Sequence, residues 1–157
     1  MSQVVEIADL AGRGALMGLD PGTRTIGVAV SDGLQMTATA LETIQRRRFK
    51  ADAARLAEIA QHRAIAGVVI GLPLNMDGSE GPRCQSARAF ARNVLQALDL
   101  PVVLWDERLS TVAAERTLLQ ADTSRRKRAE VIDAMAAQFI LQGALDRLAY
   151  LAGAHDV

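Results

Sequence analysis

The feature that most constrains the fold is a pair of short apolar runs joined by a tight-turn signal. Residues 16–20 (LMGLD) stop at Pro21-Gly22, and residues 26–31 (IGVAVS) are rich in residues that favour strands. This pattern predicts a β-hairpin. Residues 37–44 predict a third strand that leads into an arginine cluster, so the chain is expected to begin with a β-meander.

Predicted helices and strands alternate along the rest of the chain. They are a helix at residues 51–62, a strand at 68–70, a helix at 83–98, a strand at 102–105, a helix from Ser110 or Thr111 to about 120, a basic loop, and a last helix at 130–151. Strand–helix–strand crossovers give parallel pairs. The expected fold class is therefore α/β, with a mixed sheet covered by helices.

The chain length and composition suit one domain. The 157 residues are 50% hydrophobic, and we expect residues 16–151 to form the domain and residues 1–15 a loose N-terminal tail. No apolar run approaches the roughly 18 residues of a membrane span, and the N-terminus lacks the features of a signal peptide. The single cysteine, Cys84, cannot form an internal disulfide, which favours a cytoplasmic location.

The net charge is zero, but the basic residues are clustered. Only Lys50 and Lys127 are lysine, and two clusters stand out at residues 46–50 (RRRFK) and 125–128 (RRKR). Arginine can hold a phosphate through two hydrogen bonds, so the clusters are candidate nucleic-acid contacts. The alternative is two solvated loops.

Three acidic residues could face a common cleft. Asp20 ends the first strand, Glu107 follows the strand ending at Trp105, and Asp133 lies on the last helix among small and apolar neighbours. Each has an ordinary alternative: Asp20 as a turn former, Glu107 as a surface partner of Arg108, and Asp133 paired with arginines of its own helix. Converging carboxylates repel and need a cation between them, and an all-oxygen set suits Mg²⁺ or Mn²⁺.

The segment 71–79 (GLPLNMDGS) follows a predicted strand, where α/β folds bind ligands. Asn75 and Ser79 could contact phosphate or sugar, or the segment could be a plain turn. Zinc is not expected, because the chain has one cysteine and only two distant histidines, His62 and His155.

Four motifs in order resemble the YqgF family, the pre-16S ribosomal RNA nucleases also described as Holliday-junction-resolvase-like. They are residues 20–29 (DPGTRTIGVA), 71–78 (GLPLNMDG), 106–111 (DERLST) and the run of 126–128 (RKR), 131–133 (VID) and 136–137 (AA). The resemblance covers residues 16–145. The departures are mild: Ser79 where threonine is common, and Cys84 after the second motif.

The resemblance implies a ribonuclease-H-like fold and a metal-dependent nuclease that processes precursor 16S ribosomal RNA. It implies that Asp20, Glu107 and Asp133 are the catalytic and metal-binding residues. The residues expected to contact the substrate are Arg24, Asn75, Arg108, Ser110, Thr111, Arg126, Lys127 and Arg128. Aromatic residues are only 3% of the chain, so backbone recognition is expected rather than base stacking.

Three other functions fit parts of the sequence. A resolvase of branched DNA would use the same chemistry and would favour a homodimer over a monomer. An ATP-binding protein of the actin and sugar-kinase kind would share the Asp-x-Gly-Thr turn, but it needs a second domain that is not found. A non-catalytic factor could bind RNA in pre-ribosomal particles and use the acids only structurally. No membrane partner is expected.

Overall fold

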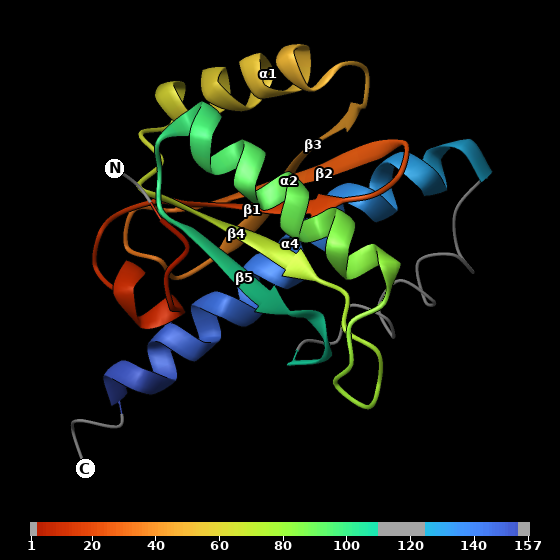
Figure 1. The fold of residues 1–157 in the computed structure, drawn as a ribbon. Coiled ribbons are helices and arrows are strands. Elements are labelled where there is room, and N and C mark those ends of the chain that lie inside the picture. Colours follow the sequence, from red (N-terminus) through yellow and green to blue (C-terminus); the bar gives the residue numbers. More distant parts are fainter. Residues whose placement is uncertain (1–2, 110–124, 154–157) are drawn as a thin grey trace.

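A computed structural model describes residues 3–109 and 125–153, with the side chains of residues 125–131 outside the description (Figure 1). Its elements are η1 (Ile7–Leu10), β1 (Leu16–Pro21), β2 (Thr25–Ser31), β3 (Ala38–Gln45), α1 (Phe49–His62), β4 (Gly67–Leu72), α2 (Pro82–Leu98), β5 (Val102–Asp106), η2 (Glu107–Leu109) and α4 (Arg125–Gly153).

The five strands form one mixed sheet in the order β3-β2-β1-β4-β5. The hairpin β1–β2 and the pair β2–β3 are antiparallel, while β1–β4 and β4–β5 are parallel. The predicted meander and the predicted parallel crossovers are therefore both confirmed. The predicted helix after Ser110 or Thr111 lies outside the described residues.

Helices cover both faces of the sheet. Helix α4 crosses one face, and α1 and α2 lie on the other (Figure 1). Along β1 the side chains alternate: Leu16 packs in the cluster that contains Leu141 of α4, while Met17 and Leu19 pack in the cluster that contains Leu56 of α1. Even-numbered residues of β1 therefore face α4, and odd-numbered residues face α1 and α2.

The segment before β1 is packed, not loose as expected. Leu10 is fully buried, and the Val5 N–H donates to the Val102 carbonyl oxygen at 2.8 Å. The Gln35 amide further donates to the carbonyl oxygens of Leu10 and Gly14. The expectation of a loose tail fails because one apolar anchor and main-chain pairing hold the segment, and neither produces a periodic pattern.

The last helix begins earlier than predicted. Helix α4 starts at Arg125, so the second basic cluster, expected in a loop, lies in the first turns of this helix. Arginine, lysine, alanine and glutamate are all good helix formers, and nothing in residues 125–130 ends a helix. No helix in the described part of the chain is long and apolar enough to cross a membrane.

Candidate active site

The site is organised around Asp20 at the carboxyl end of β1. Asp20 is an even-numbered residue of β1, so its side chain faces α4 as that of Leu16 does. Asp20 is buried, with only 9% of its surface exposed. A carboxylate this well buried is costly unless polar groups or charges surround it, and Asp20 does have polar interactions. The sequence also allowed Asp20 as a turn former, and its role as a catalytic carboxylate stays a prediction.

Two glycines flank Asp20 in the sheet. Gly27 of β2 is its cross-strand partner. On the other side, Leu19 pairs with Ile70 of β4, so Gly71 is the next residue along that strand and lies beside Asp20. The sheet therefore has no side chain on either side of the Asp20 carboxylate, which leaves room for groups from other elements.

Each glycine accommodates one of the other two predicted acids. A Cβ atom at Gly71 would lie 2.6 Å from Glu107 Oε1, so the Glu107 carboxylate covers Gly71. A Cβ atom at Gly27 would collide with the main-chain oxygen of Asp133, so α4 rests directly on Gly27. The sheet register thus places Glu107 on one side of Asp20 and the Asp133 backbone on the other.

The Asp133 carboxylate is held by the hairpin. The Thr25 hydroxyl of β2 donates to Asp133 Oδ2 at 2.5 Å, across 108 positions of sequence. Thr25 is two residues before Gly27, so the same strand contacts both the main chain and the side chain of Asp133. Sequence reasoning missed Thr25, although it lies inside the first motif.

The donors are of the right kind for a hard divalent cation, since all three side chains offer carboxylate oxygens. In the part of the chain that the structure describes, no three His, Cys, Asp or Glu side chains are close enough to hold a metal ion. The structure therefore places the three acids around the carboxyl end of β1 without closing them into a coordination shell.

Arg108 fixes the loop that follows β4. Its guanidinium donates to both carboxylate oxygens of Asp106 and to the Met76 carbonyl oxygen. The hydrogen bond from Arg108 holds the pKa of Asp106 below its ordinary value. Arg108 was predicted to contact the substrate, and in the structure it ties the second motif to the end of β5.

The second motif itself is a closed turn. The Asn75 amide donates to the Ser79 hydroxyl at 3.0 Å, and Ser79 donates to Asp77 from both its N–H and its hydroxyl. These bonds from Ser79 lower the pKa of Asp77. Asn75 and Ser79 therefore build the loop, which agrees with the plain-turn interpretation and leaves a substrate contact by Asn75 as a prediction.

The other predicted substrate contacts are placed only in part. Arg24 is exposed in the β1–β2 turn, beside the site. Ser110 and Thr111 lie outside the described residues, and so do the side chains of the second basic cluster. The predicted contacts within that cluster are Arg126, Lys127 and Arg128, which lie two turns or less before Asp133 on α4.

A family model described as "RuvX: Holliday junction resolvase" matches residues 14–147. The chain belongs to the RuvX family. This RuvX member is 66% identical to a Cereibacter sphaeroides protein over 145 residues (92% of this chain, 91% of the relative). It is 62% identical to a Roseobacter denitrificans protein over 152 residues (96% and 93%). Both relatives carry the name "Putative pre-16S rRNA nuclease".

Solved structures confirm the predicted fold class of this RuvX member. Thermus thermophilus RuvC in complex with a Holliday junction substrate superimposes with a TM-score of 0.54 at 16% identity, covering 84% of this chain and 93% of that one. A second T. thermophilus RuvC structure gives 0.50 at 18% identity, covering 83% and 93%. The fold is ribonuclease-H-like, and at this identity the likeness extends to the fold alone.

Proposed function

We propose that this RuvX member is a metal-dependent nuclease that hydrolyses phosphodiester bonds of structured RNA during maturation of precursor 16S ribosomal RNA. The observation that carries the proposal is the nearly buried Asp20 between two glycines that admit Glu107 and Asp133. The names of the relatives support the choice of precursor ribosomal RNA as substrate. The single cysteine favours the cytoplasm as its location.

Asp20, Glu107 and Asp133 are the proposed ligands of Mg²⁺ or Mn²⁺. When bound, such an ion supplies an activated water and neutralises charge on the scissile phosphate. The protein's own part is positioning: β1 fixes Asp20, η2 presents Glu107 over Gly71, and Thr25 keeps Asp133 at the edge of the site.

A second candidate is the resolution of four-way DNA junctions. It is favoured by the family description and by the fold shared with RuvC. Paired cuts on a symmetric junction favour a two-fold dimer, so the resolvase is expected to be dimeric at working concentration. A binding factor without catalysis is the third outcome to be separated.

The test is cleavage of a panel with Mg²⁺ or Mn²⁺ by wild type, Asp20→Asn and Asp133→Asn. The panel holds single-stranded RNA, a precursor-like structured RNA, duplex DNA and a four-way DNA junction. Asp146→Asn is the matched control, because Asp146 is an exposed carboxylate of the same helix α4.

We expect wild type and the control to cut structured RNA and the two site variants to lose cutting while remaining folded. Symmetric cutting of the junction alone would replace the RNA proposal by the resolvase. Undiminished cutting by Asp20→Asn would remove Asp20 from the mechanism, and binding without any cutting would leave a non-catalytic factor.

A further inference from the structure

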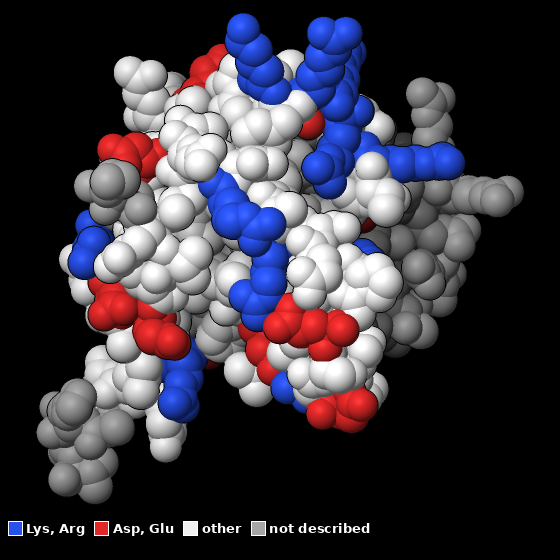
Figure 2. Space-filling view, viewed as in Figure 1, with Lys and Arg blue, Asp and Glu red and all other residues white. Residues whose placement is uncertain are grey.

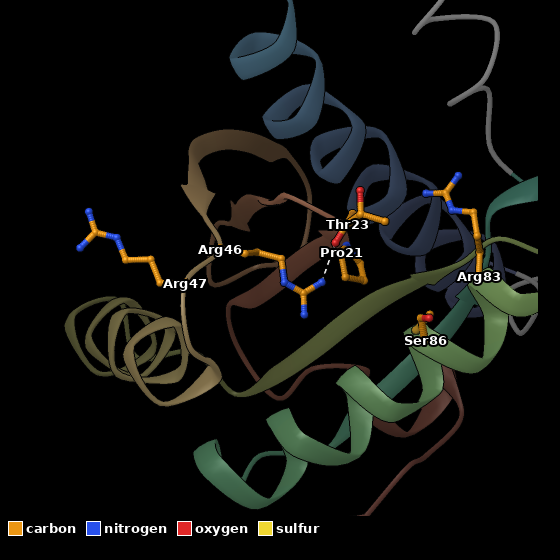
Figure 3. Close-up of a pocket in the computed structure, with 8 residues that line it drawn as sticks. Pro21, Thr23, Arg46, Arg47, Arg83 and Ser86 are labelled. Atoms are coloured by element: carbon orange, nitrogen blue, oxygen red, sulfur yellow. Dashed lines mark hydrogen bonds between the residues drawn. The ribbon is translucent and has the colours of Figure 1, made fainter.

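A cavity of about 460 Å³ lies at the β1–β2 turn, on the opposite side of the sheet from the three acids. Its lining includes Pro21, Thr23, Arg46, Arg47, Arg83 and Ser86, and none of the lining residues is acidic (Figure 3). Pro21 directly follows Asp20, and successive residues of a strand face opposite sides. The end of β1 therefore separates the candidate active site from this basic cavity.

Arg46 is fixed in place at the cavity. Its Nη1 donates to the Gly22 carbonyl oxygen at 2.5 Å (Figure 3). Its guanidinium also lies 5.3 Å from the centre of the Phe90 ring. A guanidinium has five N–H donors, and the bond to Gly22 uses one of them. Arg46 is therefore both pre-oriented and able to donate to a further acceptor.

Arg83 approaches the cavity from the first turn of α2. It is exposed, and among the described residues it forms no ion pair, whereas Arg88 on the same helix is neutralised by Glu80 at 2.7 Å. The hydroxyl-bearing Ser86 lies one turn further along. The positive end of the α2 macrodipole adds to the attraction of an anion at this place.

The basic character extends beyond the cavity. Figure 2 shows Lys and Arg side chains gathered over the part of this face where α1 begins, while most of the visible Asp and Glu side chains lie along its left side and in its lower part. Arg47 and Arg48, in the connection before α1, are exposed and belong to this region. A polyanion is therefore attracted to the surface that leads to the cavity.

We propose that this cavity binds a backbone phosphate of the nucleic acid next to the position that is cut. The inference rests on the proposed function, because it assigns the cavity to the same substrate. A strand that crosses the β1–β2 turn presents one phosphate to the acids on the α4 side and a neighbouring one to Arg46 and Arg83. Two planar guanidinium groups suit the tetrahedral array of phosphate oxygens.

The test uses binding of a fluorescein-labelled RNA hairpin with single-stranded flanks, in EDTA, at several KCl concentrations. The variants are Arg83→Ala and Arg83→Glu, with Arg92→Ala and Arg92→Glu as matched controls. Arg92 is exposed on the same helix, lies outside the cavity lining, and forms no ion pair with a described residue. Circular dichroism and Tm show whether each variant is folded.

We expect Arg83→Ala to weaken binding roughly tenfold, as loss of a charge-assisted hydrogen bond does. The slope of log K against log salt should fall by about one, and Arg83→Glu should weaken binding further. The Arg92 variants should stay close to wild type. Equal slopes for Arg83→Ala and Arg92→Ala would overturn the assignment.

Two further arms separate the alternatives. Calorimetry with inorganic phosphate should show no tight binding; micromolar binding that Arg83→Ala abolishes, with an unchanged RNA slope, would assign the cavity to a free phosphate compound instead. Cleavage by the same preparations isolates the proposed function. If Arg83→Ala weakens RNA binding but wild type cuts nothing, the cavity assignment stands and the nuclease proposal is rejected. If cleavage depends on Asp20 but Arg83→Ala binds RNA as wild type does, the nuclease proposal stands and the cavity assignment is rejected.

Discussion

Replacing Gly71 by alanine should damage cleavage much more than it damages the fold. The new Cβ would lie 2.6 Å from Glu107 Oε1 and 2.6 Å from Ile140 Cδ1, and both atoms are the far ends of flexible side chains. The main chain can therefore stay in place while these side chains move away. Overpacking of this kind costs about 1–3 kcal/mol of folding free energy. For a domain of this size that corresponds to a fall in Tm of roughly 2–12 °C.

The effect on catalysis follows from how far Glu107 must move. Contacts shorter than 3.4 Å are unusual for a Cβ atom, so relief of the contact moves Oε1 by up to about 0.8 Å. A misplacement of about 1 Å in a catalytic constellation costs on the order of a hundredfold in rate. We therefore expect single-turnover cleavage of the structured RNA to slow by roughly 10- to 100-fold in Gly71→Ala.

Two comparison variants separate the causes. Gly33→Ala is the matched control, because a Cβ atom there meets nothing within 4 Å. Ile140→Val in the Gly71→Ala background removes the Cδ1 contact and leaves the Glu107 contact. This double variant should recover part of the lost Tm without recovering the cleavage rate. A full cleavage rate in Gly71→Ala, at a lowered Tm, would refute a catalytic role for the position of Glu107.

Three other perturbations test separate parts of the structure. Thr25→Val removes the hydroxyl that holds Asp133 and should raise the Mn²⁺ concentration needed for half-maximal cleavage by about 10- to 100-fold, with rescue by Thr25→Ser; an unchanged midpoint contradicts the positioning role. Leu10→Ala should lower the free energy of unfolding in urea by about 2–5 kcal/mol, whereas a loose tail would give a change near zero. Asp106 has a lowered pKa beside Arg108, so its stabilisation is complete above about pH 4 and is lost as pH falls through the folded pKa; Asp106→Asn should lose less Tm than wild type between pH 5 and 3, and parallel curves would refute this.

Much of the fold could be predicted because its elements have strong local patterns. The hairpin has its turn signal at Pro21-Gly22, and α2 has apolar residues at helical spacing, of which Ala87, Phe90 and Val94 are buried. The packed N-terminal segment could not be predicted, because a single buried leucine has no period. The early start of α4 was missed because a basic cluster was interpreted as a loop, although its residues favour a helix.

The site could be predicted as a set of residue types but not as an arrangement. The sequence places Asp20 and Glu107 after strands, yet only the sheet register shows that Gly27 and Gly71 are the neighbours of Asp20. The bond between Thr25 and Asp133 depends on how α4 crosses β2, which no local pattern encodes. Arg108 connects Asp106 to the loop at Met76, and this contact likewise depends on the tertiary structure rather than on a local pattern.

The two glycines beside Asp20 link the stability of the sheet to the proposed chemistry. A glycine inside a strand usually costs about 0.5–1 kcal/mol relative to alanine, so two of them at the centre of a sheet weaken it. Here alanine cannot recover that energy, because its Cβ would meet the main-chain oxygen of Asp133 at Gly27 or the Glu107 carboxylate at Gly71. The contact at Gly27 is with helix backbone, so relief there requires α4 to move, and the contact at Gly71 is relieved by a side chain. The position of α4 that closes the core over β2 therefore also sets the distance of Asp133 from Asp20. A larger residue at Gly27 would displace α4, so it would disturb the site and destabilise the fold together.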